Sequence, residues 1–195
     1  MTALGRGTPP PAAQSTRGVV VDVSLPAGTA ALVAALLSQA PPYPPLLVGT
    51  TGSELPREAL KAYSSRAPVV LAANFSTGVP LLLKTIAGLK GALPSGWSAE
   101  VTEIHHTKKV DAPSGTAKRI LTALQGAGVE GLGGSAPPCH ALRLGDTVGT
   151  HTVYLAGPGE RLEITHTATR REVFAEGALR LAKWALTLAP GFYEV

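Results

Sequence analysis

A short stretch near the middle of the chain gathers residues that exchange protons. His105 and His106 are adjacent, and Lys109 follows within four residues. Imidazole and ammonium groups in one short loop suit general acid catalysis near neutral pH. Pro113 and Ser114 follow a few residues later, and then Gly115 and Thr116, whose backbone N–H groups can bind an anion if a helix begins there. The stretch therefore predicts a pocket in which a small carboxylate is held and protonated.

Two other interpretations of these residues stay open. The histidines can end a strand beside an ordinary capped helix, with Lys108 and Lys109 in solvent. A zinc site would combine His105 or His106 with another histidine, namely His140, His151 or His166. That spacing matches no familiar zinc pattern, and no cysteine or carboxylate is paired with it, so we expect no metal.

Strands and helices alternate with short connections in the first part of the chain. We expect strands at 19–23, 46–48 and 69–72, and helices at 26–38 and 57–65. This order predicts a doubly wound parallel sheet, in which ligands bind beyond the carboxyl ends of the strands. The residues at those ends are small or hydroxylic: Ser24, residues 49–51 and residues 74–76.

The second part of the chain has a different pattern, with several strands in succession. We expect helices at 78–93 and 113–125, and strands at 98–104, 141–144, 149–156 and 160–167. Gly157, Pro158 and Gly159 predict a hairpin between the last two strands. Together these elements predict a separate α+β domain with a mixed sheet. A final amphipathic helix is expected at 172–188, with Val173, Leu179, Ala182, Trp184 and Leu186 on its buried face.

The composition narrows the class of protein. The chain has 195 residues, 45% of them hydrophobic and 15% charged, which is typical of a globular fold. The net charge is +4, but the basic residues are scattered and not interleaved with aromatics, which argues against nucleic acid. No apolar run reaches the roughly 20 residues of a membrane helix, and three consecutive prolines in the first 14 residues argue against a signal peptide. The single cysteine, Cys139, cannot form an internal disulfide, so we expect a cytoplasmic protein. With nucleic acid and membrane disfavoured, we expect its partner to be a small molecule.

The segment Glu103–Ala117 closely resembles the signature of the dihydrodipicolinate reductase family, E-x-H-H-x-x-K-x-D-A-P-S-G-T-A. Other segments resemble further parts of that family: residues 21–29, 49–52, 72–79 and 149–165. The resemblance extends from about Val19 to Trp184.

The resemblance implies reduction of dihydrodipicolinate (4-hydroxy-tetrahydrodipicolinate) to tetrahydrodipicolinate by NADH or NADPH, in lysine and diaminopimelate biosynthesis. It implies that His105 is the catalytic proton donor and acceptor and that Lys109 is the second donor. The substrate ligands that it implies are His106, Ser114, Gly115 and Thr116. The residues that it places along the dinucleotide are Gly49, Thr50, Thr51, Ala72, Ala73, Asn74 and Phe75. A homotetramer is also implied.

The resemblance further implies how the chain divides into domains. We expect an incomplete dinucleotide-binding domain at 1–76, with a loop at 1–17, then a substrate-binding and oligomerisation domain at 77–167. Residues 168–195 would return to the first domain. The family opens with a strand and a G-x-x-G-x-x-G turn, for which Gly5 and Gly7 are no substitute because prolines follow them. We therefore expect an N-terminally truncated member, or alternatively a non-catalytic remnant that binds a dicarboxylate.

Overall fold

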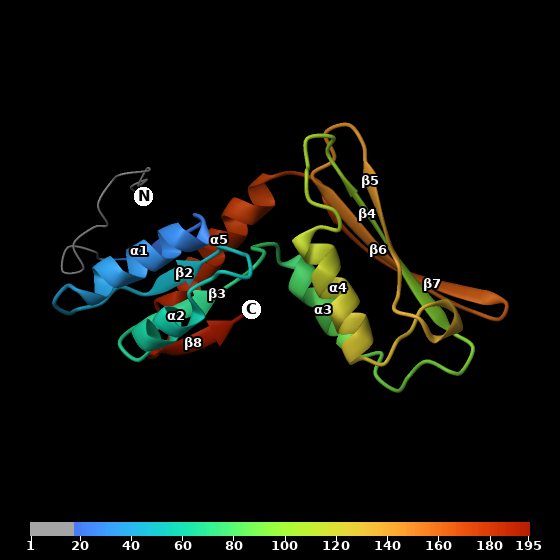
Figure 1. The fold of residues 1–195 in the computed structure, drawn as a ribbon, viewed down its shortest axis with the longest axis horizontal. Coiled ribbons are helices and arrows are strands. Elements are labelled where there is room, and N and C mark those ends of the chain that lie inside the picture. The colour runs from blue at the N-terminus through green and yellow to red at the C-terminus, as the bar shows by residue number, and fades with distance from the viewer. Residues whose placement is uncertain (1–17) are drawn as a thin grey trace. The chain divides into compact units, whose positions relative to one another are not determined.

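The computed structural model describes residues 18–195 (Figure 1). The expectations for residues 1–17, including Gly5 and Gly7, lie outside the described residues. The chain forms two compact units. Unit 1 comprises the described residues up to Phe75 together with Phe174–Val195, and unit 2 is the continuous segment Ser76–Val173.

Unit 1 is built on a parallel sheet of short apolar strands. The strands are β1 (Val20–Asp22), β2 (Leu46–Val48), β3 (Pro68–Leu71) and β8 (Gly191–Glu194), in the order β1-β2-β3-β8. The three residues of β2 and the four of β3 are all buried, as expected for strands covered on both faces. The predicted parallel sheet is confirmed, and β8 is an addition that the sequence did not reveal.

Helices cover both faces of this sheet. On one face, α1 (Pro26–Leu37) and α2 (Arg57–Ser64) bury side chains such as Leu36 and Tyr63 against the strands. On the other face, α5 (Glu172–Ala185) packs Leu181 and Ala185 against β2 and β3. This arrangement confirms the α/β class predicted for the first part of the chain.

The predicted buried face of α5 is wrong for Leu179, Trp184 and Leu186, whereas Ala182 packs against the core as predicted. Leu179 and Leu186 are 52% and 57% exposed, whereas the buried positions are Gly177, Leu181 and Ala185. At Gly177 a β-carbon would overlap the backbone carbonyl of Phe75, so only glycine allows this approach. The close approach at Gly177 therefore determines the buried face, on which Leu181 and Ala185 also lie.

Unit 2 contains a mixed sheet, as predicted. Its strands are β4 (Ser98–His105), β5 (Cys139–Arg143), β6 (Gly149–Gly157) and β7 (Glu160–Ala168), in the order β5-β4-β6-β7. β4 pairs in parallel with β5, whereas the β4–β6 and β6–β7 pairs are antiparallel. A tight turn at Pro158 and Gly159 joins β6 to β7, and Gly159 has a φ of +81° that favours glycine.

Two helices, α3 (Gly78–Ala87) and α4 (Gly115–Gly126), cover one face of the mixed sheet (Figure 1). Ile86, Ile120 and Leu124 pack there against Val101 and Val153. The first helix ends six residues earlier than predicted, because a glycine-rich turn begins after Ala87. A short 3-10 helix, Leu132–Gly134, interrupts the loop that precedes β5. Within residues 18–195, no helix has the length and apolar character needed to cross a membrane.

A candidate active site at one end of the mixed sheet

The helix-covered face of β4 changes from apolar to polar along the strand. Its inward positions are Ala99, Val101, Glu103 and His105, and all four side chains are buried. A fully buried glutamate is unusual, since removing a carboxylate from water is costly unless it is paired. The end of β4 therefore has to supply partners for Glu103.

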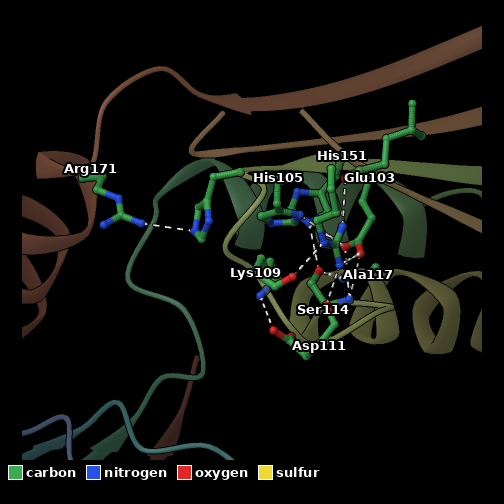
Figure 2. A network of polar contacts seen from close by, with 11 residues as sticks. Glu103, His105, Lys109, Asp111, Ser114, Ala117, His151 and Arg171 are labelled. Atoms are coloured by element: carbon green, nitrogen blue, oxygen red, sulfur yellow. Dashed lines mark hydrogen bonds and ion pairs between the residues drawn. The ribbon is translucent and has the colours of Figure 1, made fainter. Parts of the chain in front are cut away.

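Glu103 is surrounded by hydrogen-bond donors and basic groups (Figure 2). Both carboxylate oxygens accept the N–H of Ser114 at 3.1 Å. The Nδ1 atom of His105 lies 3.7 Å from Oε2, and the Nε2 atom of His151 lies 3.8 Å from the same oxygen. Arg143 brings its Nη2 atom within 3.5 Å of Oε1. The carboxylate thus joins three strands, β4, β5 and β6, to the start of α4.

Ser114 is the N-cap of α4. Its Oγ atom accepts the N–H of Ala117 at 3.1 Å, which satisfies one of the free donors in the first turn. The Ser114 hydroxyl also lies 3.2 Å from Nε2 of His151, to which it can donate. Gly115 and Thr116 are the first two residues of this capped helix. Their backbone N–H groups therefore belong to a fixed helix start of the kind that binds anions.

Arg143 fixes the loop that carries Lys109. Its Nε atom donates to the carbonyl of Lys109 at 3.1 Å, and its Nη2 atom donates to that of Asp111 at 2.6 Å. The ammonium of Lys109 pairs with the Asp111 carboxylate at 2.7 Å. This pairing lowers the pKa of Asp111. Lys109 is therefore held near His105 by an exposed carboxylate that a ligand can replace.

His106 is directed to a different place from His105. Its Nε2 atom lies 3.3 Å from Nη2 of Arg171. Both residues line a depression of about 380 Å³, together with Thr107, Lys108, Gly145, Asp146 and Val148. His105, Lys109 and Gly115 are not among its lining residues. The predicted substrate residues are therefore divided between two places. His106 lines this depression, whereas Ser114 contacts the Glu103 carboxylate. The sequence had predicted a single pocket.

Burial dominates the electrostatics of the histidines in unit 2. Desolvation is the largest effect on the pKa of His105 and lowers it, while nearby Glu103 opposes the shift. Desolvation, and then the neighbouring His105, lower the pKa of His151 to about 4. Burial also lowers the pKa of His166, which lies opposite His151 on β7 and has its Nε2 atom 3.1 Å from the Ser76 hydroxyl. All three histidines therefore favour the neutral form at neutral pH.

In unit 1, several of the predicted dinucleotide residues lie together at the carboxyl end of the parallel sheet. Gly49 is so close to the ring of Phe75 that a β-carbon would overlap it. Thr50 donates to the Ser24 carbonyl at 3.1 Å. Ala72 is fully buried beside α5, whereas Thr51 and Ala73 are exposed and Asn74 is half-buried. A flat ligand at this edge would meet small residues and one aromatic ring, which fits a dinucleotide.

The sequence predicts no role for Glu103 or Arg143, and it indicates His151 only as a possible zinc ligand. Glu103 and His151 could have been found from strand alternation, since they are in phase with the buried residues Val101 and Val153. No comparable signal exists for Arg143. Its position depends on the parallel pairing of β5 with β4, which places it opposite His105.

Glu103, His105 and His151 also have the spacing of a metal site, because one ligating atom from each lies within 4.8 Å of the others. Two of these groups already have protein partners. The Ser114 N–H occupies both oxygens of Glu103, and the Ser114 hydroxyl pairs with Nε2 of His151. A metal ion that used these atoms would compete with these hydrogen bonds, so the geometry favours a hydrogen-bonded network.

The family model and the curated relatives that match this chain all belong to one family. Residues 78–195 match the family model described as dihydrodipicolinate reductase, C-terminus. A 4-hydroxy-tetrahydrodipicolinate reductase of Xanthomonas campestris pv. campestris is 42% identical over 178 residues, which cover 91% of this chain and 71% of that protein. The enzyme of the same name from Halorhodospira halophila is 40% identical over 201 residues, covering 95% of this chain and 74% of that protein.

A solved structure supports the fold. Dipicolinate-bound dihydrodipicolinate reductase from Paenisporosarcina sp. TG-14 aligns with a TM-score of 0.70 at 20% identity, covering 91% of this chain and 71% of that one. The identity to the curated relatives and the match over residues 78–195 establish the relationship. The chain belongs to the dihydrodipicolinate reductase family.

Proposed function

We propose that the protein is a 4-hydroxy-tetrahydrodipicolinate reductase that uses NADH or NADPH in lysine and diaminopimelate biosynthesis, in the cytoplasm. The names of the relatives support this activity. The single observation that carries the proposal is the cluster at the end of β4, where His105 lies beside the capped start of α4. His105 can give up a proton, and the start of α4 can hold an anion.

In this proposal His105 and Lys109 are the catalytic residues. Burial keeps the pKa of His105 low in the free protein. A bound dicarboxylate would bring negative charge to the imidazole and raise its pKa, so that His105 takes up a proton as the substrate arrives. Lys109 would exchange Asp111 for the substrate and offset the charge that grows during reduction.

The substrate ligands in this proposal are His106, Ser114, Gly115 and Thr116. The N–H groups at the start of α4 would bind one carboxylate. His106 and Arg171 line the adjacent depression and would bind the other, because both can donate hydrogen bonds. The Paenisporosarcina enzyme is described as dipicolinate-bound, which supports a planar dicarboxylate as the ligand class.

The nicotinamide cofactor would supply the hydride, and unit 1 would hold it. The proposed contacts are the carboxyl-end residues Gly49, Thr50, Thr51, Ala72, Ala73, Asn74 and Phe75. The approach of the Phe75 ring to Gly49 supports this assignment, since it puts an aromatic ring at the edge where parallel sheets bind dinucleotides.

We also propose a homotetramer assembled through the uncovered face of the mixed sheet. Leu142, at 46% exposure, and Ile104 lie there, beside a row of threonines that includes Thr152 and Thr165. Light scattering is expected to give four times the 19.9 kDa mass of one chain. A particle of one chain's mass would contradict the tetramer.

The activity is tested by following the oxidation of NADH and of NADPH with freshly prepared synthase product as substrate. Turnover that depends on both substrates is expected. The alternative is a non-catalytic protein that binds a dicarboxylate, which is favoured by one observation: unit 2 alone contains every proposed substrate residue. Calorimetry separates the two. Heat from 2,6-pyridinedicarboxylate, without turnover and without dinucleotide heat, would support the alternative.

A further inference from the structure

Glu103 lies between the proton-transfer part of the site and the anion-binding part. Its carboxylate accepts the N–H of Ser114, directly before the helix residues proposed to bind substrate. On its other side, Oε2 is 3.7 Å from Nδ1 of His105. The Glu103 side chain is fully buried, so solvent screens these interactions less than it would at a surface.

We propose that Glu103 is a positioning residue of this site. Its carboxylate fixes the first turn of α4 against the end of β4, and it supplies the negative charge beside which His105 takes up a proton. This inference rests on the proposed function only in treating His105 as the proton donor. The anchoring of α4 is independent of that assignment.

The two roles depend on different properties of the side chain. Anchoring Ser114 requires an acceptor at the length of a glutamate, whereas favouring the imidazolium of His105 requires a negative charge. Glu103→Gln keeps the length and removes the charge. Glu103→Asp keeps the charge and shortens the side chain by one methylene. The pair of variants therefore separates reach from charge.

Other charged and titratable groups also face His105, and the experiment has to hold them constant. They are His151 on β6, Arg143 on β5, and Lys109 and Asp111 in the adjoining loop. Lys109 and Arg143 oppose protonation of His105, whereas Glu103 and Asp111 favour it. Neither Glu103 variant alters these four side chains.

The first measurement is the titration of the His105 ring by NMR, in a buffer that contains a metal chelator. In Glu103→Gln the midpoint is expected to fall by about one pH unit or more, because an opposite charge within 4 Å is lost. In Glu103→Asp the midpoint is expected to stay much closer to the wild-type value. A purely structural role predicts no such difference between the two variants.

The second measurement is binding of 2,6-pyridinedicarboxylate by calorimetry, together with hydrogen exchange of the Ser114 amide. Glu103→Asp is expected to bind roughly tenfold more weakly and to exchange this amide faster, since the shorter carboxylate cannot hold the first turn of α4. If the wild type binds no dicarboxylate, the proposed function fails, but the titration and the amide exchange still test the positioning role.

Glu100→Gln is the matched control. Glu100 lies on the same strand and pairs with a histidine, since its Oε2 is 2.9 Å from Nε2 of His140, but this pair is exposed on the other face. Its substitution should change neither the titration midpoint of His105 nor the hydrogen-exchange rate of the Ser114 amide.

An unchanged His105 midpoint in Glu103→Gln would overturn the charge role. An unchanged exchange rate of the Ser114 amide in Glu103→Asp would overturn the anchoring role. If Glu103→Gln does not fold, Glu103→Asp still decides the anchoring role, and a His105 midpoint that falls there despite the retained charge would count against the charge role.

Discussion

His151 on β6 lies directly opposite Glu103 on β4, and its Nε2 atom is 3.8 Å from the Glu103 Oε2 atom. Although this carboxylate favours the protonated ring, burial and the nearby His105 outweigh it and lower the pKa of His151 to about 4. The histidine is therefore neutral in the folded protein over a pH range in which it is protonated in the unfolded chain. This difference makes the stability depend on pH.

The free energy of unfolding should fall as the pH is lowered through the interval between the unfolded pKa of about 6.5 and the folded pKa. The contribution of His151 is fully present above the unfolded value, because neither state is then protonated. Between about pH 7.5 and about pH 5 we expect a loss of roughly 2 kcal/mol from His151 alone, measured by urea unfolding. His105 and His166 act in the same direction, because their pKa values are also lowered.

His151→Gln should flatten this pH dependence by the same amount. His140→Gln is the control, because His140 is an exposed histidine on the opposite face of the sheet. If His151→Gln and the wild type lose equal stability over this range, the buried neutral histidine is not the cause.

Replacing either proposed proton donor should reduce turnover without unfolding the protein. His105→Gln and Lys109→Met are each expected to lower kcat by roughly a hundredfold to ten-thousandfold, as for the loss of a general acid. Steady-state rates measure the loss of turnover, and circular dichroism checks that the fold is retained. Lys118→Met, an exposed position on α4, should keep the wild-type rate. Wild-type rates in both active-site variants would remove the catalytic assignment.

The contact between Gly177 and Phe75 should tolerate no β-carbon. Gly177→Ala would force α5 away from the Phe75 carbonyl, and we expect a loss of about 1–3 kcal/mol or more in the free energy of unfolding. Gly126→Ala provides the comparison, because a β-carbon at this end of α4 meets no atom within 4 Å. It should be neutral or stabilising by up to about 1 kcal/mol. Similar unfolding midpoints for the two variants would contradict the close approach.

Removal of metal ions should leave the activity unchanged. Both oxygens of Glu103 and the Nε2 atom of His151 are already hydrogen-bonded to Ser114. Rates measured before and after dialysis against a chelator are therefore expected to agree. Activity that is lost on dialysis and restored by zinc would instead assign Glu103, His105 and His151 as ligands.

Much of the fold could be predicted because its strands are strongly patterned. Continuous apolar runs located β2 and β3 almost to the residue, and the alternation in 98–104 located β4. Where the prediction of α5 was wrong, a backbone-to-backbone contact at Gly177 decided the buried face, and no helical periodicity encodes such a contact. β8 was missed because its four residues, Gly191–Glu194, include no continuous apolar run of the kind that identified β2 and β3.

The site was only partly predictable for a similar reason. His105, Lys109 and Ser114 are close in sequence, so the local pattern was sufficient to group them. Arg143 and His151 join them through cross-strand register, which one sequence does not reveal. The separate direction of His106 depends on Arg171, more than sixty residues away.

The division of the chain has a consequence for the sequence distance over which each sheet pairs its strands. Unit 2 is one uninterrupted segment, so all the strands of the mixed sheet lie within Ser76–Val173. The parallel sheet of unit 1 differs, because β3 and its partner β8 lie on either side of that whole segment. The half that carries His105 can therefore pair its strands within one segment, whereas the other half has to join strands that unit 2 separates in the sequence.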